Sequence, residues 1–394
     1  MLYFFIFGLT AALSPHLKPL SLTILHRHGD RSPLHPLTSS DEFWQDNSQS
    51  KYWSGVGVKE SVWERLVKEV VFEDCDNDGD PHWANGSPPY GKLTQLGFMQ
   101  LVKLGGETRE RVDHFFSQSS PPSSVKPTDV KFLSTPFDRT KMSAVGFSLG
   151  FFPESTENTK TDKKTKIKLT PDFIPDRDGE PGPTDDIQFP LAVGKEELDR
   201  LKMTLSNVIV GDILGGTYSM PLNTMRLLDH LTVLKSRSLI SRDVKEALPN
   251  SFHDDCAKLE LVAVRGWRDW VVKGKGSKMC SQVGWGFVMG LDREHNTKDK
   301  VTVVSCHDST LVSLMSLFGQ LAYFNFDRTT TEIKTWPGYA SWLQVEFYQH
   351  QENDQVYVRF LYDGTVVVPT NRGEECDDYG CFELNYLKEI SIVG

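Results

Sequence analysis

The sequence contains no Cys-x-x-Cys pair, although it has six cysteines in 394 residues. Structural zinc sites and thioredoxin-like redox sites both depend on such pairs, so neither is predicted. No internal repeat is visible either, which argues against a solenoid or propeller. With 39% hydrophobic and 11% aromatic residues, the chain can nevertheless bury a sizeable core, and we expect a folded protein.

The chain also lacks an excess of positive charge. It has 43 Lys and Arg against 53 Asp and Glu, and a formal net charge of -10. This balance repels polyanions, so nucleic acid is not an expected partner. A small anionic ligand would need a local positive pocket.

There is no hydrophobic run long enough to span a membrane. The longest apolar stretch, Leu2 to Leu13, has the length of a secretory signal core. We therefore interpret residues 1–19 as a signal peptide and lead-in, and predict a secreted protein or one of the lysosomal or endomembrane lumen. Asn85-Gly86-Ser87 is a glycosylation acceptor that agrees with export. No Lys or Arg precedes the run, so a strand or helix of the fold remains the alternative.

Strand, polar turn and helix follow one another in three parts of the chain, which predicts an α/β fold with a mixed central sheet flanked by helices. Residues 339–369 alternate polar and apolar side chains around a turn, which indicates an antiparallel addition at the sheet edge. We expect residues 20–150 and 265–394 to form the core and 151–264 an inserted, mainly helical cap. We expect a strand with its loop at 20–30 and further strands near 130–133 and 301–304. The expected helices span 93–116 (with Thr94 as N-cap), 137–149 and the residues from 309 onward.

Two of the predicted strands end in clusters of charge. The segment Arg27–Arg31 follows the first strand, and His307 and Asp308 follow the strand near 301–304. Ligands of open α/β sheets bind beyond the carboxyl ends of the strands, so we expect the two clusters to share one site.

The residue types in these clusters suit phosphoryl transfer. Guanidinium groups bind phosphate oxygens bidentately and offset their charge, and an imidazole between them can attack phosphorus. A carboxylic acid such as Asp308 can then protonate the leaving group. Singly, either cluster is more typical of a solvated turn or a helix cap; together they favour a site.

The same residues carry a family resemblance. Arg27–Pro33 matches the RHGxRxP signature of the histidine acid phosphatases, and His307-Asp308 resembles their HD motif. Segments 91–105, 134–153 and 339–348 are similar to segments of prostatic and lysosomal-type members, in the same order. The resemblance implies a phosphoglycerate mutase-like core.

The resemblance also implies roles for single residues. His28 would form a phosphohistidine, Asp308 would protonate the leaving group, and Arg27, Arg31 and His307 would bind phosphate. No metal or cofactor would be required. The substrate would be a small-molecule or protein phosphate monoester, and a homodimer is one assembly that relatives suggest. Cys376 and Cys381 lie close together in a polar turn and resemble the family's late disulfide.

One position departs from the expected pattern. The resemblance implies a third phosphate-binding arginine directly before Ser134-Thr135, where this chain has Leu133. Arg139 is assigned to a separate arginine of the pattern. Loss of one charge-assisted contact costs about 2–4 kcal/mol of transition-state stabilisation, so a weak or inactive phosphate-binding protein is the principal alternative.

Three competing motifs receive less support. Gly146–Gly150 matches the G-x-S-x-G elbow of serine esterases, with Ser148 as nucleophile, but it ends a predicted helix instead of following a strand. None of the cysteines starts a Cys-x5-Arg phosphate loop. Asp74–Asn85 begins like a calcium-binding EF-hand loop but has Asn85 where the last ligand is a glutamate, so a solvated loop is favoured.

Overall fold

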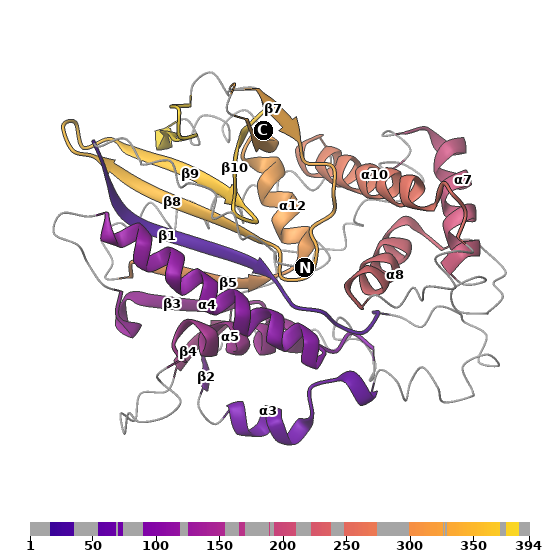
Figure 1. Cartoon of the computed structure of the whole chain (residues 1–394), viewed down its shortest axis with the longest axis horizontal. Coiled ribbons are helices and arrows are strands. Elements are labelled where there is room, and N and C mark those ends of the chain that lie inside the picture. The colour runs from indigo at the N-terminus through magenta and orange to yellow at the C-terminus, as the bar shows by residue number, and fades with distance from the viewer. Residues whose placement is uncertain are drawn as a thin grey trace, which may run out of the picture.

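A mixed β-sheet runs through the molecule and carries helices on both faces (Figure 1). The computed structural model describes residues 16–34, 54–67, 70–73, 90–118, 125–153, 165–169, 189, 193–209, 222–237, 248–273, 299–325, 327, 329–370 and 376–385. In this part of the chain the strands lie in the order β2-β4-β3-β5-β1-β8-β9-β10-β6-β7, and β11 pairs with β9. Their bounds are β1 (Leu17–Arg27), β2 (Val70–Glu73), β3 (Val130–Ser134), β4 (Thr165–Leu169), β5 (Val301–Cys306), β6 (Leu321–Phe324), β7 (Thr330–Glu332), β8 (Trp342–His350), β9 (Val356–Tyr362), β10 (Thr365–Pro369) and β11 (Phe382–Glu383).

The sheet changes character at β1. From β2 to β1 every neighbouring pair is parallel, whereas β1 pairs antiparallel with β8 and the strands beyond it form antiparallel pairs. The predicted α/β fold and the predicted antiparallel addition are both confirmed. Asp363 and Gly364 make the turn between β9 and β10 with positive φ at both positions, as a two-residue hairpin requires.

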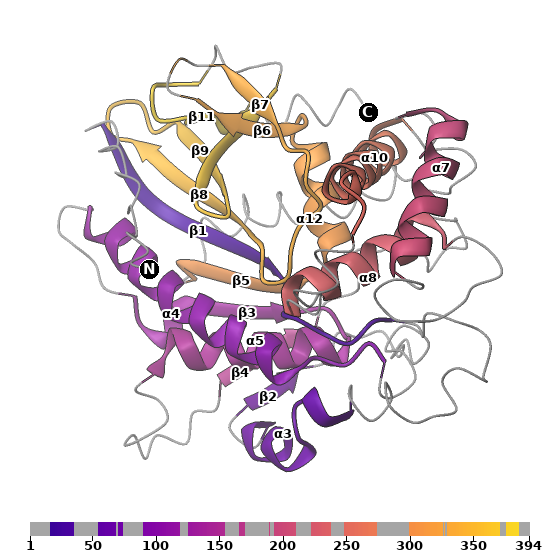
Figure 2. The same ribbon diagram turned by 45° about the vertical axis from the view of Figure 1, so that its right-hand side comes forward.

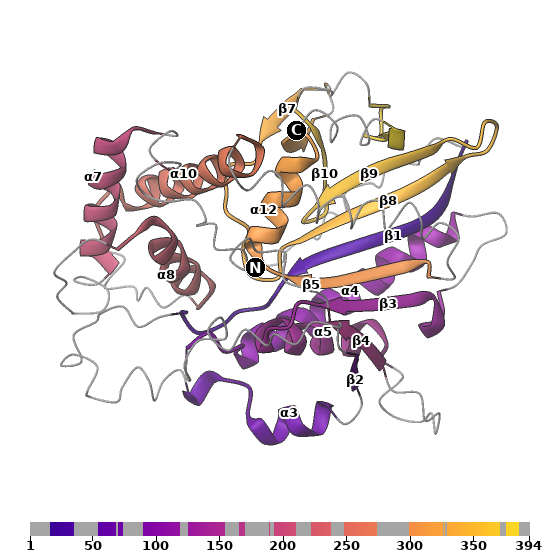
Figure 3. The ribbon, with the colours of Figure 1, turned by 180° about the vertical axis from the view of Figure 1, so that it is seen from behind.

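Helices cover both faces of the sheet. Figure 2 shows α4 and α5 lying together along one face, while α12 lies on the other. Helices α7, α8 and α10 gather beyond the end toward which β1 and β5 point, as Figures 1 and 3 show from opposite sides. Helix α10 packs against α12, and so joins this helical group to the sheet. The helices have the bounds α3 (Glu60–Val67), α4 (Gln95–Ser117), α5 (Asp138–Phe151), α7 (Lys195–Ser206), α8 (Thr224–Arg237), α10 (Phe252–Lys273) and α12 (Asp308–Leu317), and a short 3-10 helix spans Pro127–Asp129.

Strand β1 shows how the sequence produces this layering. Its residues from Leu22 onward are buried on both faces, as expected of a strand with neighbours on either side and helices above and below. Leu22 and Ile24 pack with the side chains of α4 and α5, whereas Leu25 packs with those of α12. The alternation then continues into the polar end of the strand, so His26 and Arg27 face opposite sides.

Three predicted boundaries differ from the structure. Strand β4 falls within the predicted cap but pairs with β2 and β3 in the sheet, because its alternating Ile167 and Leu169 are buried. Helix α10 continues past residue 264 without a break, and β1 already begins at Leu17, within the predicted lead-in. Residues 1–15 and the Asp74–Asn85 loop lie outside the described residues.

The predicted disulfide between Cys376 and Cys381 is not formed in this structure. The two buried side chains pack in different hydrophobic clusters, Cys376 with that of α12 and Cys381 with that of α4 and α5. Hydrogen bonds close the turn between them instead: Asp377 donates its backbone N–H to the Cys381 carbonyl, and its side chain accepts from the Cys381 N–H. Among the described helices, none combines the length and apolar character needed to cross a bilayer.

Candidate active site

The two charged clusters meet where β1 and β5 end side by side. Arg27 pairs with Cys306 in the parallel register, and the His28 N–H donates to the Cys306 carbonyl over 3.0 Å. The rings of His28 and His307 consequently lie 5.5 Å apart, edge to face. The structure thus brings together two segments that are about 280 residues apart in the sequence.

Helix α4 holds the loop after β1 from the other side. A side chain at Gly29 would meet the Gly97 carbonyl at 2.1 Å, and one at Gly97 would meet the Asp30 carbonyl at the same distance. Thr94 caps α4 as predicted, accepting from the Gly97 N–H, and its hydroxyl donates to Asp30. The absence of both side chains therefore lets the helix terminus contact the loop directly.

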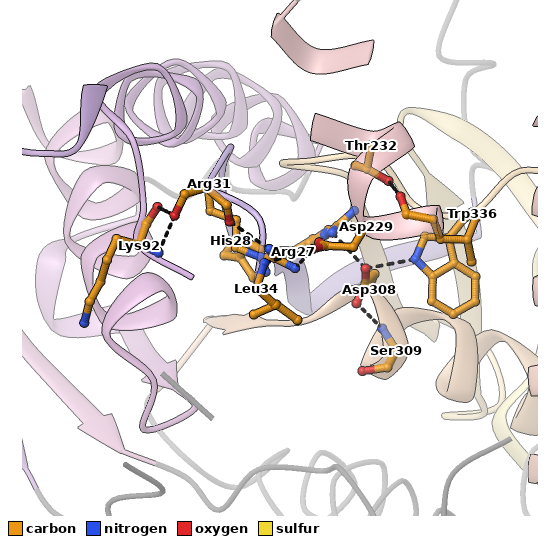
Figure 4. A network of polar contacts seen from close by, with 12 residues as sticks. Arg27, His28, Arg31, Leu34, Lys92, Asp229, Thr232, Asp308, Ser309 and Trp336 are labelled. Carbon is orange, nitrogen blue, oxygen red and sulfur yellow. Dashed lines mark hydrogen bonds and ion pairs between the residues drawn. The ribbon is translucent and has the colours of Figure 1, made fainter. Parts of the chain in front are cut away.

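Arg27 and Asp308 form the centre of a polar network (Figure 4). Nη2 of Arg27 lies 2.8 Å from Oδ2 of Asp308, and Nη1 donates to the Pro337 carbonyl. The guanidinium also stacks over the Tyr339 ring, 4.4 Å from its centroid. The ion pair joins two predicted site residues, so it holds Arg27 in the site.

His28 has the protonation and orientation that a nucleophile needs. Its Nδ1 lies 2.9 Å from the Gly29 carbonyl, which can only accept, so Nδ1 carries the hydrogen and Nε2 has the free electron pair. Burial holds the pKa of His28 well below its usual value, and three nearby guanidinium groups act in the same direction: Arg27, Arg139 and Arg31. The ring therefore stays neutral at mildly acidic pH.

His307 lies beside it on the other strand end. Its Nε2 is 3.2 Å from the hydroxyl of Thr135, which follows β3, and the edge of its ring contacts Phe137. Burial again lowers its pKa well below the usual value, with Arg139 as the next cause. Strand β3 thus contributes to the same site.

Arg31 is held by the helical group. Its Nη2 lies 2.6 Å from Oδ1 of Asp229 on α8, and Oδ2 of that carboxylate accepts the Leu34 N–H. Burial opposes ionisation of Asp229, but the charge of Arg31 keeps its pKa below the usual value. No sequence signal predicted Asp229, because the partner of Arg31 lies on a separate helix about 200 residues away.

A third guanidinium group, that of Arg139, lies near His28 and His307, although Leu133 occupies the position where an arginine was expected. Leu133 is buried in β3 and packs in the hydrophobic cluster of α12. Arg139, in the first turn of α5, is 5% exposed and lies over the Phe137 ring. Its charge lowers the pKa of both His28 and His307. Sequence reasoning missed this role, although the position of Arg139 five residues after the end of β3 was a signal that could have revealed it.

The site contains donors suited to an anion. The Nε atoms of Arg27 and Arg31 are buried and have no hydrogen-bond partner among the described residues. Leaving such donors unsatisfied is costly, so a ligand with several acceptor oxygens would be stabilised there. Among the described residues, no three His, Cys, Asp or Glu side chains lie together as possible metal ligands. That the chemistry needs no metal stays a prediction.

Ser148 does not form a nucleophile elbow. It lies within α5, is buried, and donates its hydroxyl hydrogen to the Val145 carbonyl of the same helix. A serine esterase would require it on a sharp turn between a strand and a helix. The structure therefore favours the packing interpretation of Gly146–Gly150.

Comparison with known families agrees with this geometry. Residues 20–193 match the histidine phosphatase superfamily (branch 2). The predicted resemblance to the histidine phosphatases is confirmed over this part of the chain. Prostatic acid phosphatase of Bos taurus is 28% identical over 132 residues, which are 34% of this chain and 23% of that protein. Lysosomal acid phosphatase of Xenopus laevis is 29% identical over 132 residues, 34% of this chain and 20% of that protein. The match thus spans about a quarter or less of the length of these two relatives.

Solved structures share the fold over nearly the whole chain. The apo phytase of Hafnia alvei superposes with a TM-score of 0.56 at 13% identity, covering 96% of this chain and 97% of the phytase. The multiple inositol polyphosphate phosphatase of Bifidobacterium longum, in complex with phosphate, gives a TM-score of 0.55 at 14% identity, covering 97% and 94% of the two chains. At this level of identity the likeness concerns the fold.

His26 is a buried histidine that faces away from the site. It stacks on Phe147 of α5, with ring centroids 5.0 Å apart, and its Nδ1 contacts the Arg27 carbonyl. Burial lowers the pKa of His26 to about 4. Between about pH 6.5 and 4 the unfolded chain therefore binds a proton that the folded protein excludes, so stability falls as the pH falls.

We expect His26→Phe to weaken this pH dependence, because phenylalanine keeps the stacking and does not titrate. From pH 7.5 to 4.5, the free energy of unfolding of the variant should fall by about 2–3 kcal/mol less than that of the wild type. Urea denaturation at both pH values measures this difference. His253→Phe, at an exposed position of α10, serves as the control. An unchanged pH dependence in His26→Phe would contradict the account.

Proposed function

We propose that the protein hydrolyses phosphate monoesters through a phosphohistidine intermediate on His28. The observation that carries this proposal is the state of His28: a buried, neutral imidazole with Nδ1 bound to a carbonyl and three guanidinium groups around it. A nucleophile for phosphorus needs a free electron pair, and the transferred group needs fixed positive charge. Both are present at one strand end.

The proposed reaction uses residues of the two strand ends. Nε2 of His28 forms a bond to phosphorus while the bond from phosphorus to the ester oxygen breaks. The leaving oxygen keeps the bonding electrons and takes a proton from Asp308. Arg27, Arg31 and His307 hold the phosphoryl oxygens, as the family resemblance suggests. Water then attacks phosphorus, Asp308 regains a proton, and His28 is released.

For the substrate and the location we propose only broad classes. The relatives are named acid phosphatases and the structural neighbours phytases, so a phosphate monoester is supported, from a small molecule or a protein. The word lysosomal in the name of the Xenopus laevis relative, with the apolar stretch Leu2 to Leu13, supports a secreted or lumenal location. Neutral His28 is compatible with turnover at acidic pH.

The alternative, an inactive phosphate-binding protein, depends on Leu133 standing where a third phosphate-binding arginine is expected. Arg139 supplies positive charge to the same two histidines, so the charge that Leu133 lacks is present from another position. We therefore propose Arg139 as the third cation of the phosphate site.

Turnover of an aryl phosphate near pH 5 tests the proposed function. The wild type should release phosphate, and His28→Ala should lose at least about 10³-fold in kcat because the nucleophile is gone. His253→Ala, at an exposed position on α10, should retain the wild-type rate. A wild-type protein that binds inorganic phosphate but releases none from the substrate would instead support the inactive alternative.

Arg139→Met tests the origin of the third positive charge. The variant keeps a long apolar side chain over Phe137 but lacks the guanidinium, so kcat/KM should fall by about 10²–10³-fold and inhibition by inorganic phosphate should weaken. Leu133→Met, two residues from Thr135 and buried in the sheet, should stay within about 2-fold of the wild type. Wild-type phosphate inhibition in Arg139→Met would show that the charge acts elsewhere.

A further inference from the structure

Trp336 contacts Asp308, the proton donor of the proposed reaction, although the steps given above do not involve Trp336. Its indole N–H donates to Oδ2 of Asp308 over 2.9 Å, and Arg27 contacts the same oxygen at 2.8 Å (Figure 4). Trp336 lies in the segment between β7 and β8, immediately before Pro337, whose carbonyl accepts from Arg27. One short segment thus orients both members of the Arg27–Asp308 pair.

The two carboxylate oxygens of Asp308 contact different groups. Oδ2 accepts the Trp336 N–H and also lies 2.8 Å from Nη2 of Arg27, so two N–H groups lie against this oxygen. Oδ1 accepts only the Ser309 N–H among the described residues, at the start of α12. One acceptor direction of Oδ1 therefore stays open, and a proton on that oxygen can be passed to a leaving group.

We propose that Trp336 is a positioning residue that fixes Oδ2 of Asp308 and so makes Oδ1 the oxygen that protonates the leaving group. This inference rests on the proposed function. Because Nε of Arg27 is unpartnered, Arg27 can bind a phosphoryl oxygen there while Nη2 keeps its contact with Oδ2. In the transfer step, the ester oxygen receives the bonding electrons and the Oδ1 proton together, and Asp308 is left as a carboxylate.

Packing makes Trp336 a rigid support. It is 7% exposed and contacts Trp267 of α10 edge to face, with ring centroids 5.8 Å apart. Trp267 donates its own indole N–H to Ser313 on α12, away from the Asp308 carboxylate. The neighbouring tryptophan therefore provides a matched control: the same side chain, buried to the same extent, with a different hydrogen-bond partner.

The leaving group of the substrate separates a positioning role from a structural one. A p-nitrophenolate leaves without a proton, whereas an alkoxide needs one, so only alkyl phosphates depend on a well-placed acid. The ratio of kcat/KM on an alkyl phosphate to that on p-nitrophenyl phosphate is also independent of how much of a variant is folded. Glycerol phosphate and p-nitrophenyl phosphate are suitable probes.

We expect Trp336→Phe to lower this ratio about 10-fold, the effect of one hydrogen bond, with KM on both substrates within about 2-fold of the wild type. Asp308→Asn should lower the ratio further, and Trp267→Phe should leave it unchanged. Trp336→Leu, which also lacks the N–H, should behave as Trp336→Phe does.

The outcomes separate the positioning role of Trp336 from the proposed function. Equal losses on both substrates, or an unchanged ratio in Trp336→Phe and Trp336→Leu, would overturn the positioning role while the proposed function stands. A wild-type protein that hydrolyses neither substrate would overturn the proposed function and this inference with it.

Discussion

The parallel pairing of β1 with β5 is the constraint on which the site depends. Because Arg27 is in register with Cys306, the residue that follows each strand is a histidine, and the two rings lie side by side. A slip of one residue would turn the side chains of β1 to the opposite faces. Leu25 and Ile24, buried on opposite sides of the sheet, oppose such a slip. The same packing that forms the core therefore aligns the two histidines of the candidate site.

The buried cations are stabilised before any ligand is bound. An unpaired guanidinium in a protein interior costs several kcal/mol, and here Asp308 and Asp229 lie within ion-pair distance of Arg27 and Arg31. Asp308 begins α12 directly after β5, and Asp229 lies on α8 of the helical group, so the site depends on both parts of the fold. The two unpartnered Nε atoms remain as donors for an anion. Donors for an anion are thus in place before the ligand binds.

The sequence was sufficient to predict much of the fold and the central residues. Strand and helix patterns around Leu22, Phe132 and Val303 predicted the layers, and the charged ends of two strands predicted where they would meet. The contacts between segments far apart in the sequence could not be predicted from local patterns. Asp229 and Trp336 have no local pattern that points to the site, and Arg139 was assigned by motif position alone. The alternating burial in β4 was also missed, because a short strand beside a loop rich in lysine resembles exposed chain.

The buried histidines set a balance between reactivity and stability at low pH. Neutral rings at His28 and His307 suit nucleophilic attack and hydrogen bonding in mildly acidic solution, yet each buried neutral histidine makes unfolding more favourable as the pH falls. The fold therefore has to offset this penalty through packing, as the stacking of His26 on Phe147 illustrates.

Identification of the covalent intermediate tests the central claim most directly. A phosphate monoester with a radiolabelled phosphoryl group is mixed with the protein and quenched in alkali, where phosphohistidine survives, and the labelled peptide is sequenced. The account predicts a single label on Nε2 of His28. A protein that turns over the substrate with its label on another residue, or with no covalent label at all, would contradict it.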